Sequence, residues 1–176
     1  AEKGHIKVVE CLIANNATLD IADDEGKTPL HLAAEKGQLE VVQCLVETKK
    51  VDVNAKAKNG DTPLCTAVRA GNEEVIKYLV EEAHAYVTGA YGQELLHVAS
   101  VRKLARPGIY DYIRIKVREK ESDELLQAIK GGDLEKAKEM IAADINVNRA
   151  RDEESRSILY WAVAKGDEGL VQDLLD

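Results

Sequence analysis

The sequence predicts an all-α protein built as a solenoid, in which pairs of antiparallel helices stack on one another. The phrase GKTPLHLAAEKG at residues 26–37 returns as GDTPLCTAVRAG at residues 60–71, so that Thr28 and Thr62 lie 34 residues apart. The opening AEKGHIKVVECLI also matches AEKGQLEVVQCLV at residues 34–46. A period of about 20–50 residues is typical of a repeat architecture, in which each unit buries its apolar face against its neighbours.

The first helix of each repeat has both of its ends marked in the sequence. Thr28 and Thr62 suit the N-cap position, and a proline follows each of them at the first helical residue, where a missing N–H costs nothing. Gly37 and Gly71 fall just past the predicted helix end, where a left-handed residue lets the chain reverse. We therefore expect a short helix between each proline and the following glycine.

The second helix of each repeat is predicted from apolar residues spaced three and four apart. Such residues recur through residues 39–46 and again through 75–80. This spacing gives an amphipathic helix with one buried face. Neither helix pair can bury its apolar residues alone, so the neighbouring repeats have to cover them.

Weaker copies of the repeat continue to the end of the chain. An alanine that marks the first helix recurs in steps of 34, 32, 29 and 34 residues, at Ala33, Ala67, Ala99, Ala128 and Ala162. We expect a single array over residues 1–176 with about five to six full or partial repeats. They are a partial repeat at 1–22, repeats at 23–56 and 57–88, an irregular repeat with a long inter-helix loop at 89–121, a degenerate repeat at 122–151 and a terminal repeat at 152–176.

The step of 29 residues predicts an irregular joint, with a kink, near residues 101–121. Pro107 and Gly108 are expected to lengthen the link between the helices of the third repeat. Its second helix then runs into the fourth repeat with little or no finger, and Ser122 is expected to begin the next helix as its N-cap.

Residues 113–120 alternate with period two, which leaves a strand open as an alternative to this second helix. A helix with a buried stripe at Ile109, Ile113 and Val117 is favoured.

The charge of the chain is unevenly distributed. Its net charge is −8, yet residues 101–118 hold six basic residues against Asp111 alone. This segment could bind an anionic ligand such as lipid or nucleic acid, but nucleic acid is disfavoured because the rest of the chain is strongly acidic and no nucleic-acid motif accompanies the cations. No apolar run approaches the roughly 20 residues of a membrane helix. The three cysteines are interpreted as small apolar residues, typical of a reducing compartment.

The Thr-Pro-Leu-His-x-Ala motif at this period resembles the ankyrin repeat. The resemblance implies helix pairs joined by finger loops, with the fingers and first helices lining a concave face that binds a partner protein. It also implies that the motif histidines His31 and His97 form hydrogen bonds within and between fingers.

By the geometry of that family, the partner-binding residues are those before the Thr-Pro position and those at the exposed end of the first helix. Tyr91 is the expected aromatic anchor. The candidates are Asp24, Glu25, Lys27, Glu35, Lys36, Lys58, Asn59, Asp61, Arg69, Tyr91, Gln93, Arg102, Glu153, Glu154, Arg156 and Lys165. Asn54 also resembles the asparagines that cytosolic hydroxylases modify in ankyrin proteins, although a structural role in the finger is favoured.

No metal-ligand spacing, phosphate-binding loop or nucleophile motif occurs in the sequence, so we expect neither an enzyme nor a cofactor. The favoured function is a monomeric, cytoplasmic scaffold for another protein. The alternatives are the targeting fragment of a larger protein, for example a bacterial effector in the host cytosol, and anionic-ligand binding by residues 101–118.

Overall fold

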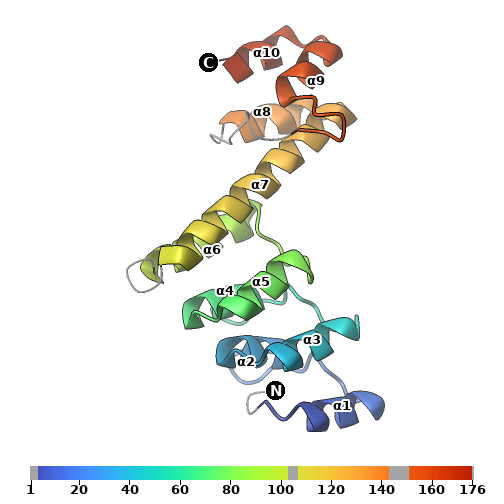
Figure 1. The fold of residues 1–176 in the computed structure, drawn as a ribbon, viewed down its shortest axis with the longest axis vertical. Helices are drawn as coiled ribbons and strands as arrows, with labels where there is room; N and C mark the ends of the chain where they lie inside the picture. Colours follow the sequence, from blue (N-terminus) through green and yellow to red (C-terminus); the bar gives the residue numbers. More distant parts are fainter. Residues whose placement is uncertain (1–3, 103–106, 143–150, 176) are drawn as a thin grey trace. The chain divides into compact units, whose positions relative to one another are not determined.

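The structure is a computed structural model that describes residues 4–102, 107–142 and 151–175. All the regular elements within these residues are helices, which confirms the all-α prediction (Figure 1). They are α1 (Ile6–Ala14), α2 (Pro29–Lys36), α3 (Leu39–Glu47), α4 (Pro63–Ala70), α5 (Glu73–Glu81), α6 (Gly89–Arg102), α7 (Pro107–Gly131), α8 (Leu134–Ala142), α9 (Ile158–Lys165) and α10 (Glu168–Leu175).

The chain divides into two compact units, Ala1–Ile113 and Arg114–Asp176, which we call unit 1 and unit 2. In unit 1 the first helices α2, α4 and α6 lie next to one another, and the second helices α1, α3 and α5 form a neighbouring layer. The predicted pairs are α2 with α3 and α4 with α5. The second-helix stripes are buried as expected, with Val42, Leu45, Ile76 and Leu79 almost inaccessible to solvent.

The predicted ends of the first helices are confirmed. Thr28 and Thr62 are extended residues that directly precede α2 and α4. The Thr62 hydroxyl accepts the N–H of Cys65 at 3.2 Å, which satisfies one of the free donors at the start of the helix. Gly37 and Gly71 adopt left-handed conformations at the C-caps.

His31 links the first two complete repeats. Its Nδ1 accepts the N–H of Thr28 at 3.1 Å, so the proton lies on Nε2, which donates to the carbonyl of Asp61 at 3.0 Å. The ring therefore closes the first turn of its own helix and holds the finger of the next repeat. Because the ring is completely buried, desolvation lowers the pKa of His31 and keeps it neutral.

Asn72 forms a second connection between these repeats. Its side-chain amide donates to the carbonyls of Ala34 and Glu35, at 2.8 and 2.9 Å. These carbonyls belong to the last turn of α2, where partners within the helix run out, and the Ala34 carbonyl otherwise accepts only a long bond of 3.4 Å from the cap residue Gly37. The loop before α5 thus completes the end of a helix in the preceding repeat.

The prediction of a helix start at Ser122 is wrong. Ser122 is 2% exposed and lies inside α7, a continuous helix of 25 residues. Apolar residues at Ile113, Val117, Leu125 and Ile129 follow one another at steps of four, eight and four residues, and neither proline nor glycine occurs between positions 109 and 130. The second helix of the third repeat and the next first helix are therefore fused, and the strand alternative is excluded.

The start of α7 corrects a second expectation. Pro107 and Gly108 lie in its first turn and not in the link before it, because proline is tolerated at the first helical position. Residues 103–106 of that link lie outside the described part of the chain. The predicted repeat boundaries and the kink near residues 101–121 stay predictions.

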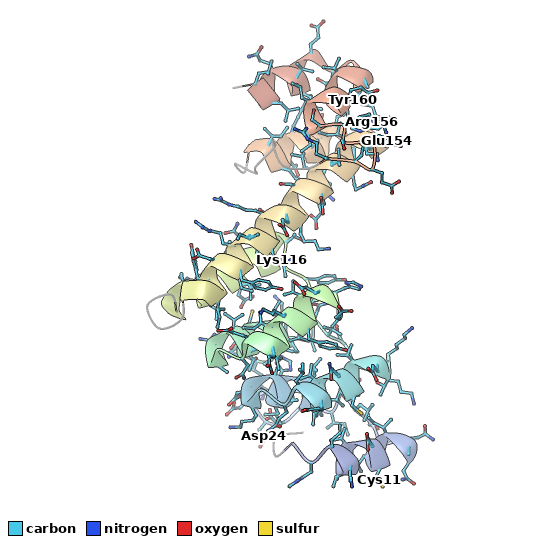
Figure 2. The ribbon with its side chains drawn as sticks, viewed as in Figure 1. Cys11, Asp24, Lys116, Glu154, Arg156 and Tyr160 are labelled. Atoms are coloured by element: carbon cyan, nitrogen blue, oxygen red, sulfur yellow. The ribbon has the colours of Figure 1, made fainter. Side chains whose placement is uncertain are left out.

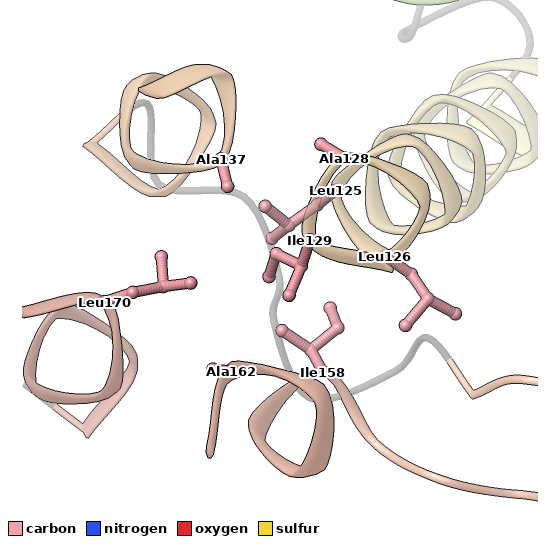
Figure 3. Packing of buried hydrophobic residues seen from close by; sticks show 8 residues of the cluster. All are labelled: Leu125, Leu126, Ala128, Ile129, Ala137, Ile158, Ala162 and Leu170. Atoms are coloured by element: carbon pink, nitrogen blue, oxygen red, sulfur yellow. The ribbon is translucent and has the colours of Figure 1, made fainter. Parts of the chain in front are cut away.

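Unit 2 has its own hydrophobic core, formed by the end of α7 with α8, α9 and α10 (Figure 3). Leu125 and Ile129 from α7 pack with Ile158 from α9 and Leu170 from α10. As in unit 1, a hydroxyl begins the first helix, since Ser157 accepts the N–H of Tyr160 at 3.2 Å. A left-handed glycine, Gly166, ends it.

Three positions of α9 are exposed although their equivalents in earlier repeats are buried. Leu159, Tyr160 and Val163 correspond to Leu30, His31 and Ala34 of α2, which are fully covered by the following repeat. Tyr160 is 50% exposed and Val163 is 61% exposed. In the described residues no further first helix covers α9 as α4 covers α2.

We predict that Ser155→Gly stabilises unit 2. Ser155 has a φ of 63° in the finger before α9, at the position that Gly26 and Gly60 occupy in earlier fingers. Removing Cβ at a left-handed position should raise the free energy of unfolding by about 1 kcal/mol. Urea unfolding followed by fluorescence of Trp161, the single tryptophan, would measure the change. Ser155→Ala is the control, and an equal gain in both variants would contradict the prediction.

We also predict that His31 makes unit 1 sensitive to mild acid. Burial lowers the folded-state pKa of His31, so its contribution is complete above the unfolded value of about 6.5 and is lost as the pH falls below it. Between pH 7.5 and 5.5 the free energy of unfolding should fall by up to about 1 kcal/mol more in the parent than in His31→Gln. Urea titrations followed by circular dichroism at both pH values test this, and identical losses would refute it.

Candidate functional site

The finger before α2 is organised by Asp23. Its carboxylate accepts the N–H groups of Glu25 and Lys27, at 2.9 and 2.8 Å, and its carbonyl accepts the N–H of Gly26. This tight turn exposes the candidates Asp24 and Glu25 at its tip. Sequence reasoning missed Asp23 as an organiser, although it precedes Thr28 by the same five residues as Asp152 precedes Ser157.

Lys27 joins this finger to α2. Its ammonium group lies 3.1 Å from a carboxylate oxygen of Glu25 and 3.1 Å from one of Glu35. Hydrogen bonds to Glu25 and then to Glu35 raise the pKa of Lys27. Lys36 lies 3.7 Å from the other oxygen of Glu35. All five candidates of this repeat thus lie around one surface hollow of about 340 Å³.

In the next repeat, Asp61 and Arg69 form the equivalent ion pair. Two guanidinium nitrogens of Arg69 donate to the two carboxylate oxygens of Asp61, at 2.8 and 3.2 Å, and this bond raises the pKa of Arg69. Asn59 donates to the same carboxylate at 2.9 Å. Asp61 is only 7% exposed, whereas the Arg69 side chain is 51% exposed, so Arg69 is the accessible member of the pair.

The two ion pairs have opposite polarity. Lys27 and Glu35 occupy the positions that Asp61 and Arg69 occupy 34 residues later. The finger tips follow the same order, since exposed Asp24 in the first finger corresponds to exposed Lys58 in the second. The main-chain N–H of Lys58 donates to the carbonyl of Glu25 at 3.0 Å, which brings an acidic and a basic tip together.

The third repeat departs from the predicted arrangement. Gln93 was expected in a finger before the first helix, but α6 already begins at Gly89. Glu94 and Leu95 occupy the positions at which the earlier repeats have Thr-Pro. The sequence therefore has no N-cap and proline that would make the helix begin at residue 95. Gln93 is exposed on α6. The side chains of Tyr91 and Arg102 lie outside the described part of the structure.

Two candidates of the last repeat, Glu154 and Arg156, form a cluster in unit 2 together with Tyr160 (Figure 2). Arg156 donates to the carboxylates of Asp152 and Glu154, at 2.7 and 2.6 Å. Its guanidinium lies over the rings of Tyr160 and Trp161, with 5.5 and 4.8 Å to the ring centroids. Such cation–π contacts hold the charge against the exposed aromatic surface. The other two candidates of this repeat, Glu153 and Lys165, are exposed.

The neighbours of Asp152 in this cluster stabilise its carboxylate in the ionised form. Desolvation by itself would raise its pKa, but hydrogen bonds from Arg156 and from the indole N–H of Trp161, at 2.8 Å, hold the pKa far below its usual range. The carboxylate therefore stays ionised and fixes both the cation and the indole. Neither Asp152 nor Trp161 was among the sequence candidates.

Asn54 has the structural contact expected of it. Its side-chain carbonyl accepts the main-chain N–H of Tyr86, in the next finger, at 2.8 Å. Hydroxylation of Asn54 stays a prediction.

The basic segment, residues 101–118, is described only in part, because residues 103–106 lie outside the described residues. Within α7, Lys116 pairs with Glu119 at 3.6 Å, and the Tyr112 hydroxyl donates to Glu81 at 3.0 Å.

Across residues 4–102, 107–142 and 151–175, no three or more histidine, cysteine or acidic side chains are placed to bind a metal ion. None of the helices in these ranges is long and apolar enough to cross a membrane.

Comparison with known proteins agrees with the repeat pattern. A family model described as Ankyrin repeats (3 copies) matches residues 1–57 and 44–115. No curated protein sequence matches the chain. The matched region covers α1 to α6 and the start of α7, which includes both of the repeats that carry the Thr-Pro motif. Repeats of this family are generally protein–protein interaction modules. From the period, the stacked helix pairs and this match, we conclude that the chain belongs to the ankyrin-repeat family.

Proposed function

We propose that this chain binds a partner protein through the fingers and first helices of unit 1. The observation that carries the proposal is the reversal of charge between neighbouring repeats, from Lys27–Glu35 to Asp61–Arg69. Each pair fixes its side chains at the surface, with Arg69 the most exposed of the four and Asp61 largely buried. A partner with a basic group facing the first finger and an acidic group facing the second would be complementary to this surface.

The exposure of the finger tips also supports partner binding by this surface. The Glu25 side chain is 74% exposed, and Asp24 and Lys58 are exposed without a side-chain partner among the described residues. Charges of this kind mainly steer association and select the partner, while affinity comes from better buried contacts. Tyr91 remains the proposed aromatic anchor of this surface.

The proposal is tested by reversing the two finger tips together. Asp24→Lys with Lys58→Glu leaves the net charge unchanged and removes none of the described ion pairs, so the free energy of unfolding should change by less than about 0.5 kcal/mol. At least one protein captured from cell lysate by the immobilised parent should be lost by the variant. Binding of that protein, once purified, should weaken at least tenfold, an effect that calorimetry would measure.

The matched control reverses the same kinds of charge on the second-helix layer, with Lys7→Glu and Glu47→Lys, two exposed residues of α1 and α3. This control should retain the partner. Equal retention by all three proteins would show that the finger face is not the binding surface.

A further inference from the structure

A cavity of about 250 Å³ lies between α5 and α7, in the second-helix layer of unit 1. Ile76 and Ile109 form its apolar floor and are almost completely buried. The ring of Tyr112 forms one wall, held in place by the hydrogen bond from its hydroxyl to Glu81 at 3.0 Å. The cavity is therefore separate from the finger face proposed to bind a protein.

Gly108 lines this cavity and has no side chain to occupy it. It lies in the first turn of α7, and a Cβ added there would meet no atom within 4 Å. A glycine inside a helix lowers its stability relative to alanine, and no close neighbour or left-handed backbone requires one here.

The rim of the cavity carries one cation and one anion. Glu73 and Lys77 are exposed residues one turn apart on α5, and neither has an ion pair or hydrogen bond with another described side chain. An exposed pair at this spacing attracts only weakly, so both charges remain available to a ligand.

We infer that this cavity binds a free α-amino acid with an apolar side chain. Its carboxylate faces Lys77, its ammonium group faces Glu73, and its side chain enters the space between Ile76, Ile109 and Tyr112. A zwitterion matches both rim charges at once, whereas a simple acid or amine leaves one of them unused. The volume is below the range of about 300–1,000 Å³ that is typical of drug-sized ligands, which favours a molecule of this size.

Titration of the ¹⁵N-labelled chain with L-phenylalanine tests the inference. The amide resonances of Ile76 and Ile109 should shift and saturate, with a Kd in the millimolar range expected for so small a ligand. Two analogues, 3-phenylpropionate and phenethylamine, each lack one of the two charges. Each should bind roughly two- to fivefold more weakly than phenylalanine.

Two variants separate this site from adventitious binding. Gly108→Leu should fill the cavity and abolish the shifts without destabilising the helix, and Gly131→Leu, an equally unobstructed glycine at the other end of α7, should leave them unchanged. Lys77→Met should weaken phenylalanine and 3-phenylpropionate but not phenethylamine. The inference is overturned if phenylalanine causes no saturable shift, or if its binding survives Gly108→Leu.

Discussion

Burial of each first helix depends on the first helix of the next repeat. Leu30 and Leu64 are almost completely buried because α4 lies against α2 and α6 lies against α4. The same dependence extends to polar groups, since the buried ring of His31 needs the carbonyl of Asp61 from the next repeat. The contacts between neighbouring repeats therefore contribute much of the stability, as expected for an array in which each repeat contacts only its neighbours. The exposed face of α9, which lacks such a cover, has apolar residues at the same positions.

Much of this arrangement could be predicted from local sequence. Thr-Pro and glycine define both ends of α2 and α4, because capping and left-handed backbone are properties of single residues. Where these signals are missing, the prediction failed. Without Thr-Pro, α6 begins before the expected finger ends, and without a breaker α7 continues through Ser122. A hydroxyl followed by acidic residues marks a helix start only where the preceding chain cannot itself be helical.

The candidate site was predictable as a set of positions but not as a set of interactions. Asp61 was expected to face a partner, yet its carboxylate is occupied by Arg69 and Asn59. Asp152 and Trp161 were not foreseen, because the bond between them joins a finger to a helix nine residues away. Such contacts depend on the angle at which a finger returns to its helix, which periodicity does not specify. Which candidates can reach a partner therefore follows from the three-dimensional arrangement alone.

The hydrogen bonds between the first two complete repeats have a further consequence. His31, Asn72 and the N–H of Lys58 all donate to main-chain carbonyls of the neighbouring repeat. Every residue type has such a carbonyl, whereas the residue-specific ion pairs Lys27–Glu35 and Asp61–Arg69 each lie within one repeat. A duplicated or exchanged repeat would thus bring its complementary charges with it and still find acceptors at its borders. Because the ion pairs lie within repeats and the hydrogen bonds between repeats use main-chain acceptors, recombination can change the surface charges of the array and keep the contacts between its repeats.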